Sequence, residues 1–191
     1  MFDSNSSRRG FLLGVLVSLV ALAVSACARS ASNAAAVSTQ PANVVIENFS
    51  AAGQSLGKVT VPKVIKSEDQ WRKLLGADAF VVTRHEGTER AYSGQYNDNH
   101  ADGLYRCICC DTALFDSRTK FESRTGWPSF WKPISNANVN EITDRSLMME
   151  RTAVSCKRCD AHLGHVFDDG PEPTGLRYCM NSVSLKFVPR A

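Results

Sequence analysis

Four cysteines form two Cys-x-x-Cys pairs, Cys107 with Cys110 and Cys156 with Cys159. Each pair can present two thiolates from one tight turn, and two pairs together supply the four sulfur ligands of a tetrahedral Zn²⁺ site. Four protein ligands leave no position open for water or substrate, so the predicted zinc, one per chain, is structural. It would hold together two halves of a small domain. Disulfide bonding is the alternative if the chain is exported to an oxidising compartment.

A further cysteine, Cys179, stands apart from these pairs and could act as a nucleophile. Arg177 and Asn181 lie two residues before and after it, and in a strand such positions share one face. A nearby cation lowers the pKa of a thiol, and a histidine beside it can activate the thiol or supply a proton. His162 and His165 are candidates for that role. The alternatives are a buried, unreactive Cys179 and histidines that ligate a metal.

The elements that must position these residues are short. Ser67 can cap a helix that runs to about Gly76, with Trp71 and Leu74 on its apolar side. Beyond Leu104 the chain has brief apolar runs separated by turn residues, without an alternating β-α rhythm, so the fold class is mainly β with a few peripheral helices. The predicted strands are 104–106, 113–115, 147–151, 165–167 and 183–188, with turns at 168–171 and 173–175.

Composition indicates one globular domain, excludes a disordered chain and gives no support to a nucleic-acid-binding protein. Of the 191 residues, 43% are hydrophobic and 21% are charged, which does not fit a disordered chain. The formal net charge of +3 is too small to argue for a nucleic-acid partner.

Residues 1–26 are predicted to be an export signal and not part of the fold. Arg8 and Arg9 precede an uncharged, mostly apolar run over residues 11–26, which is shorter than the about 20 residues of a transmembrane helix. The Ser-Arg-Arg-x-Phe-Leu pattern resembles a twin-arginine signal. An ordinary export signal that happens to carry two arginines is the alternative.

The end of this segment, Val24-Ser25-Ala26-Cys27, resembles a bacterial lipobox. Cys27 would then be the lipidated first residue of the mature protein and anchor it to a membrane; plain cleavage after Ala26 is the alternative. Residues 27–57 are predicted to be a flexible tether, and residues 58–191 the domain. The expected location is the periplasm or cell envelope.

Three stretches, taken in order, identify the family. Residues 125–130 (Thr-Gly-Trp-Pro-Ser-Phe), 156–167 and 177–181 (Arg-Tyr-Cys-Met-Asn) resemble those of B-type methionine sulfoxide reductases, and the resemblance extends from about Lys63 to Phe187. It implies two small antiparallel β-sheets of the β-tent, Mss4-like kind, with short N-terminal helices. The structural zinc would lie far from the catalytic pocket.

The resemblance also implies roles for individual residues. Cys179 matches the nucleophile, and Trp127 matches the aromatic wall that receives the substrate methyl group, although it could instead be ordinary core. Arg177 matches a residue beside the nucleophile. The polar residues of the pocket match His162, His165 and Asn181.

The implied reaction reduces methionine-(R)-sulfoxide, usually within proteins. Cys179 attacks the sulfoxide sulfur, His165 delivers a proton as general acid, and a sulfenic acid remains on the cysteine. Many family members carry a resolving cysteine where this chain has Thr125, and others at a position aligned with Ser93. Cys109, inside the first Cys-x-x-Cys pair, is expected to be a bystander. A small thiol or a thioredoxin-like partner is therefore expected to reduce the sulfenic acid directly.

Two other classes of protein compete with the enzyme. A zinc-ribbon-like binding module would need no reactive thiol, and a structural envelope lipoprotein would not need the whole set of pocket residues. Reactivity of Cys179 toward an alkylating reagent at neutral pH separates the enzyme from the binding module.

Overall fold

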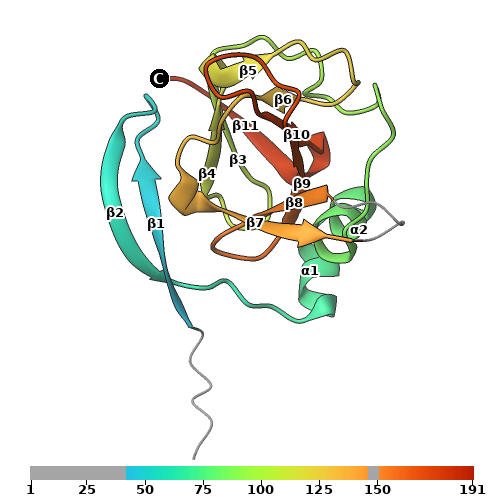
Figure 1. The fold of residues 1–191 in the computed structure, drawn as a ribbon. Helices are drawn as coiled ribbons and strands as arrows, with labels where there is room; N and C mark the ends of the chain where they lie inside the picture. The colour runs from blue at the N-terminus through green and yellow to red at the C-terminus, as the bar shows by residue number, and fades with distance from the viewer. Residues whose placement is uncertain (1–41, 146–150) are drawn as a thin grey trace, which may run out of the picture. The chain divides into compact units, whose positions relative to one another are not determined.

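The structure, a computed structural model, describes residues 42–145 and 151–191. In these residues the chain forms two short helices and three antiparallel β-sheets (Figure 1). The sheets are a β1–β2 hairpin, a three-stranded sheet in the order β11–β3–β4, and a six-stranded sheet in the order β5–β6–β10–β9–β8–β7. This arrangement confirms the predicted mainly β class, with the hairpin as an added third sheet.

The helices are α1 (Glu68–Leu74) and α2 (Ala77–His85). The strands are β1 (Asn43–Phe49), β2 (Ser55–Pro62), β3 (Gly103–Cys107), β4 (Ala113–Asp116), β5 (Lys120–Phe121), β6 (Ser129–Phe130), β7 (Val139–Asp144), β8 (Arg151–Cys156), β9 (His162–Phe167), β10 (Arg177–Met180) and β11 (Leu185–Pro189).

The β1–β2 hairpin corrects the predicted tether of residues 27–57. Strand β1 begins at Asn43, so the second half of that segment is ordered; residues 27–41 lie outside the described residues. The buried Asn138 side chain accepts from Glu47 N (2.7 Å) and donates to Glu47 O (2.9 Å) and Ala113 O (2.8 Å). Ile46 is buried. These contacts come from residues distant in sequence, which the polar composition of the segment could not indicate.

The core lies between the three-stranded and six-stranded sheets. Phe130 of β6 stacks on Phe115 of β4, with ring centroids 4.5 Å apart, and meets Tyr105 of β3 edge-on at 5.0 Å. Alternation along β10 adds Tyr178 and Met180 to the same buried cluster. The opposite face of β10 is thereby left for Cys179.

Helix α1 begins where the sequence predicts but ends earlier than predicted. Ser67 caps α1 in a capping box with Gln70, and Trp71 is buried, as expected. The helix ends at Leu74, because Gly76 is already the N-cap of α2. The β-branched residues of α2 gave no clear helical signal in the sequence.

The predicted strands at 104–106 and 113–115 are confirmed as β3 and β4. Strand β9 begins at His162, three residues before the prediction. The segment expected at 183–188 starts as a 3₁₀ turn over Ser182–Ser184 before β11. Of the strand expected at 147–151, only Arg151 lies within the described residues, at the start of β8.

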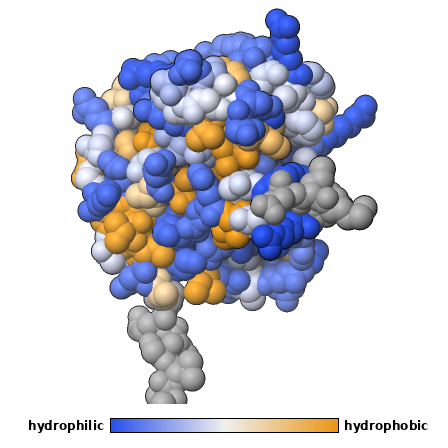
Figure 2. Space-filling view, in the orientation of Figure 1, coloured by the Kyte–Doolittle hydropathy of each residue, from blue (hydrophilic) through white to orange (hydrophobic). Residues whose placement is uncertain are grey.

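The described residues contain no helix long and apolar enough to cross a membrane. Figure 2 shows apolar residues in separate patches among hydrophilic ones on one face of the molecule. Two of the more exposed large apolar side chains are Val45, at 47%, and Val81, at 50%.

Candidate active site and metal centre

The register of the six-stranded sheet gathers the reactive side chains on one face. Cys179 of β10 pairs with His165 of β9 on one side and with Ser129 of β6 on the other. Arg177 pairs with Phe167 two positions along the same strands. Directly paired residues and their i±2 neighbours share a face. This face is therefore opposite to the one that Tyr178 buries in the core, while Met180 also reaches the cavity beside Cys179.

A β-bulge brings both histidines of β9 to this face. Ser155 of β8 pairs with His162, Val154 with Gly164 and Ala153 with His165, so Leu163 is the extra residue. Without the bulge, His162 and His165 would lie on opposite faces because their separation is odd. Their rings instead meet edge to face, with centroids 5.3 Å apart.

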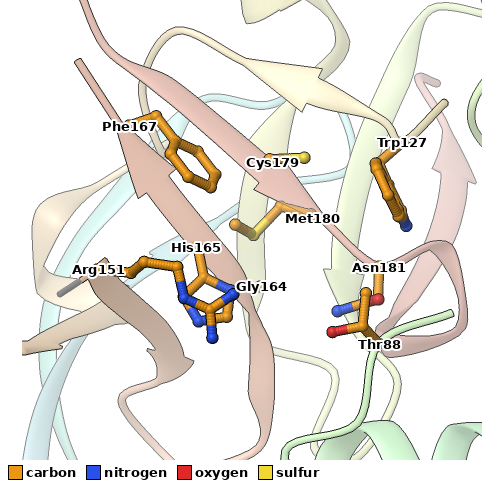
Figure 3. Close-up of a pocket in the computed structure, with 9 residues that line it drawn as sticks. All are labelled: Thr88, Trp127, Arg151, Gly164, His165, Phe167, Cys179, Met180 and Asn181. Carbon is orange, nitrogen blue, oxygen red and sulfur yellow. The ribbon is translucent and has the colours of Figure 1, made fainter. Parts of the chain in front are cut away.

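Cys179 lines a small cavity of about 130 Å³. Figure 3 shows Trp127 and Phe167 on opposite sides of Cys179, with His165 and Asn181 below it. Thr88, from the loop after α2, lies beside Asn181. The cavity therefore has apolar aromatic walls and a polar side next to one thiol.

Burial controls the protonation of this thiol. It raises the pKa of Cys179 above its ordinary value, and the opposing effects of Arg177, Thr125 and Ser129 are smaller. Arg177 thus lowers the pKa of the thiol, as expected, but burial raises it by more and the net shift is upward. Arg177 is held by a bidentate pair with Asp169, at 2.8 and 2.9 Å, and its guanidinium lies 4.3 Å from the Phe167 ring centroid.

His165 has a carboxylate partner that the sequence reasoning missed. Its Nε2 lies 3.0 Å from Asp144 Oδ2, which also accepts from Arg151 Nη2 at 2.8 Å. All three side chains are largely buried. A carboxylate in this position holds the imidazole in one orientation and one tautomer. Asp144 and Arg151 face each other across the β7–β8 ladder, a pairing that spacing along the chain does not reveal.

His162 lies next to this group and does not line the cavity. It is 5% exposed, and its Nε2 has no hydrogen-bond partner among the described residues. Burial, assisted by the neighbouring His165, lowers the pKa of His162 to about 4. The imidazole is therefore neutral at physiological pH.

Glu89 is a second residue that the sequence reasoning missed. Its main-chain N–H donates to Asn181 Oδ1 at 2.9 Å, and its carbonyl accepts from Trp127 Nε1 at 3.1 Å. Its carboxylate accepts from the backbone N–H groups of Ser182 (2.7 Å) and Val183 (3.1 Å). One residue thus orients the indole, the amide and the turn after β10. Asn181 Nδ2 also donates to the Leu163 carbonyl at 3.0 Å, so the amide joins the loop after α2 to strand β9.

The four predicted metal ligands form one cluster. The Sγ atoms of Cys107, Cys110, Cys156 and Cys159 all lie within 4.8 Å of one another. The shortest separations are 3.6 Å for Cys107–Cys159 and 3.5 Å for Cys110–Cys156. A tetrahedral ion with Zn–S bonds of about 2.3 Å places its sulfurs about 3.8 Å apart. A disulfide would need about 2.05 Å, and the cysteines of the described residues are free thiols. The donor set and spacing fit a structural metal.

Cys109 and Cys179 belong to different surroundings. The thiol of Cys109 interacts with those of Cys107 and Cys159, beside the metal cluster. The Cys179 Sγ lies 3.9 Å from Thr125 Oγ1, and Cys109 is not among the residues that line its cavity. Position 125 is thus in contact with the candidate nucleophile, but it carries a hydroxyl and not a thiol.

Comparisons with known proteins bear on this geometry. The SelR domain matches residues 75–189, which hold both the cavity and the cysteine cluster. The chain belongs to the SelR-domain family. Proteins named peptide methionine sulfoxide reductase MsrB are similar to it: that of Pseudomonas putida strain F1 is 56% identical over 128 residues, which is 67% of this chain and 98% of the relative. That of Pseudomonas syringae pv. syringae strain B728a is 55% identical over 129 residues, 68% of this chain and 98% of the relative.

Within this SelR domain, the structure gathers most of the residues that the sequence singled out. Cys179, Trp127, His165 and Asn181 line one cavity. Arg177 and His162 lie on the same face of the sheet but outside the cavity lining. Phe167, Thr88, Asp144 and Glu89 were missed. Phe167 alone had a signal in the sequence, because it lies two residues beyond His165 in the same strand.

Proposed function

We propose that this chain reduces methionine-(R)-sulfoxide in proteins to methionine, with Cys179 as the nucleophile. The observation that carries the proposal is a single thiol in a small cavity between two aromatic walls and a histidine, within a SelR domain. Cys179 Sγ bonds to the sulfoxide sulfur as the oxygen is protonated. The oxygen ends on Cys179 as a sulfenic acid, and methionine leaves.

The two sides of the cavity suit the two ends of the sulfoxide group. Trp127 and Phe167 offer apolar surface to the methyl group, while His165 can donate a proton to the oxygen. Asp144 holds the imidazole for that transfer. The apolar wall fixes where the methyl group binds, and the proton donor fixes where the oxygen binds. Only one of the two epimers at sulfur can meet both conditions, which is the basis for selecting the R epimer.

The sulfenic acid is reduced by an external thiol. Thr125 occupies the position in contact with Cys179, and Cys109 lies with the metal cluster instead. Two thiols from outside therefore supply the electrons. The first condenses with the sulfenic acid and releases water, and the second releases Cys179 as a thiol. A thioredoxin-like protein or a small thiol can serve as this donor.

The four-cysteine cluster holds a structural Zn²⁺. Cys107 ends β3 and Cys110 lies in the turn after it, while Cys156 ends β8 and Cys159 lies in the turn after that strand, so one ion joins the two main sheets. Metal analysis of the purified protein tests this: one zinc per chain is expected, and none in a Cys156→Ser, Cys159→Ser protein. Retention of another metal at full occupancy would contradict the assignment to zinc.

The chain acts in the periplasm or cell envelope, anchored by lipid on Cys27. The support is the twin-arginine-like and lipobox-like pattern of residues 7–27. Fractionation and mass spectrometry of the protein from its own cells test this. A membrane fraction with a lipidated Cys27 is expected, and a Cys27→Ser protein should lose the lipid.

Activity on separated epimers tests the reaction. The full chain with a small dithiol should reduce a protein-like methionine-(R)-sulfoxide and leave the S epimer unchanged, and Cys179→Ser should abolish turnover. Absence of turnover by folded, metal-loaded protein would contradict the proposal and favour a non-catalytic binding module.

A further inference from the structure

The cavity at Cys179 has room for one side chain and little more. Its volume of about 130 Å³ is below the roughly 300–1,000 Å³ of pockets that enclose a whole small-molecule ligand. A methionine sulfoxide within a protein is attached to a polypeptide on both sides. The residues next to it must therefore lie on the surface around the cavity.

A larger hollow adjoins the cavity at Thr88, which lines both. We call it the α2 groove; it has a volume of about 600 Å³ and runs between α2 and the loop that follows it. Its apolar surface comes from Val81 and Val82 of α2 and from Val183 of the turn after β10. Val81 is 50% exposed although its side chain is apolar.

The α2 groove and the cavity share a rigid wall. The Glu89 carbonyl accepts from Trp127 in the cavity wall, and the Glu89 carboxylate is bound to the backbone of Ser182 and Val183. Gly94 packs so closely against Ser182 that a Cβ atom at this position would clash with it. Two side chains of a bound polypeptide, one in the groove and one in the cavity, would thus be held at a defined separation.

Another hollow shares Arg151 and Phe167 with the cavity, but it is smaller than the α2 groove, with a volume of about 450 Å³. It is also lined by Glu141 and Asp168. The α2 groove is lined by as many charged residues, Asp78, Glu89 and Arg90, but the Glu89 carboxylate is already bound to the backbone of the turn after β10. The α2 groove also has the larger exposed apolar surface of the two hollows.

We infer that the α2 groove binds the polypeptide next to the oxidised methionine and takes an apolar side chain against Val81. This inference rests on the proposed function. It defines the preferred substrate as a methionine-(R)-sulfoxide with an apolar neighbour, and it assigns to Val81 a role in substrate specificity.

Kinetics with three substrates test the inference. They are N-acetyl-methionine-(R)-sulfoxide amide and two peptides in which the sulfoxide is flanked on both sides by leucine or by serine. The full-length protein should show a lower KM for the leucine peptide than for the serine peptide. Val81→Gln should raise the KM of the leucine peptide about 3- to 10-fold, because it removes one apolar contact. The amide has no flanking residues, so its KM and kcat should be the same in both proteins.

Val45→Gln is a matched control. Val45 is 47% exposed and lies on β1, outside the α2 groove, so the same change there should leave all three KM values unaltered. Equal KM values for the two peptides in the unchanged protein would overturn the inference. So would an unaltered leucine-peptide KM in Val81→Gln, or an equal rise in Val45→Gln.

Binding measured without turnover separates this inference from the proposed function. Fluorescence anisotropy of the labelled leucine peptide on full-length Cys179→Ser protein should give weaker binding when Val81→Gln is added, by the same factor as the KM change. If none of the substrates were turned over, the proposed function would fail, and this measurement would still decide the groove. Equal affinity with and without Val81→Gln would overturn the inference.

Discussion

At the scale of single residues, burial outweighs a neighbouring cation at Cys179. Arg177 favours the thiolate, but its guanidinium is also paired with Asp169. Burial disfavours the thiolate, because it removes the water that would solvate the negative charge. The net effect raises the pKa of the thiol. In the free protein the thiol therefore keeps its proton at neutral pH.

This protonation predicts how the reactivity of Cys179 depends on pH. Because the pKa is raised, the thiolate fraction is small at pH 7 and grows about tenfold for each pH unit below the pKa. Alkylation of Cys179 by iodoacetamide, followed by mass spectrometry of the peptide that contains it, should keep accelerating up to about pH 9. A plateau at or below about pH 8 would mean that Arg177 outweighs burial.

A second residue-scale prediction concerns Thr125, whose Oγ1 lies 3.9 Å from the Cys179 Sγ. A thiol in place of this hydroxyl could attack the sulfenic acid on Cys179 with little backbone movement. After one turnover without reductant, Thr125→Cys should contain a disulfide between the introduced thiol and Cys179, seen in peptide mass spectra. The unchanged protein and Thr125→Ser should instead be trapped as the sulfenic acid by dimedone. A stable Cys109–Cys179 disulfide in the unchanged protein would contradict the external-thiol proposal.

At the scale of elements, Glu89 binds the loop after α2 to the turn after β10. Glu89 satisfies two backbone N–H groups of that turn and, through its own main chain, orients Trp127 and Asn181. The contacts with Asn181 and the turn join parts of the chain about 90 residues apart. The position of the indole in the cavity therefore depends on a residue outside the six-stranded sheet.

Replacement of Glu89 should impair both stability and turnover. Glu89→Ala leaves the N–H groups of Ser182 and Val183 without their carboxylate, which should cost about 1–3 kcal/mol in the free energy of unfolding. It should also lower kcat/KM about tenfold or more, because the carboxylate no longer fixes the turn after Cys179 or the Glu89 main chain that orients the indole. Glu89→Gln keeps one acceptor oxygen and should recover most of both quantities. Urea unfolding and steady-state kinetics measure the effect, and an unchanged kcat/KM in a destabilised Glu89→Ala protein would show a purely structural role.

At the scale of the whole molecule, two main sheets pack face to face, and the four-cysteine cluster takes two of its thiols from each. The active face belongs to the larger sheet, and the cluster lies at the turns after β3 and β8. The four-cysteine cluster and the cavity that contains Cys179 have no residue in common. This separation allows one chain to use cysteine for two different kinds of chemistry.

Buried His162 makes the stability of the whole domain depend on pH. Its pKa is about 4 in the folded protein against 6.5 in the unfolded chain. The unfolded chain therefore binds more protons between these values, and stability falls as pH drops from about 6.5 to about 4. The loss attributable to this residue is roughly 2–4 kcal/mol.

Urea unfolding at about pH 7 and about pH 4 measures this loss, and His162→Gln is the comparison because glutamine is polar but does not titrate. The unchanged protein should lose more stability between the two pH values than His162→Gln does. Equal losses would show that His162 is not buried as a neutral group.

The sequence by itself determined the features that depend on local spacing. Two thiols separated by two residues converge on one ion from a single turn, and residues at i±2 in a strand share a face. The metal ligands and the alignment of Arg177 with Cys179 could therefore be predicted. The motif order at residues 125–130, 156–167 and 177–181 indicated the family, and with it the fold and the candidate roles of Trp127, His165 and Asn181.

Only the tertiary structure decided what depends on contacts between distant segments. The bulge at Leu163 sets the face that His162 occupies, and strand pairing brings Asp144 to His165. Burial of Cys179 reverses the expected direction of its pKa shift, and Asn138 orders a hairpin predicted to be a flexible tether. Solvent exclusion and cross-strand hydrogen bonds are set by the packing of the whole chain, so no short stretch of sequence carries them.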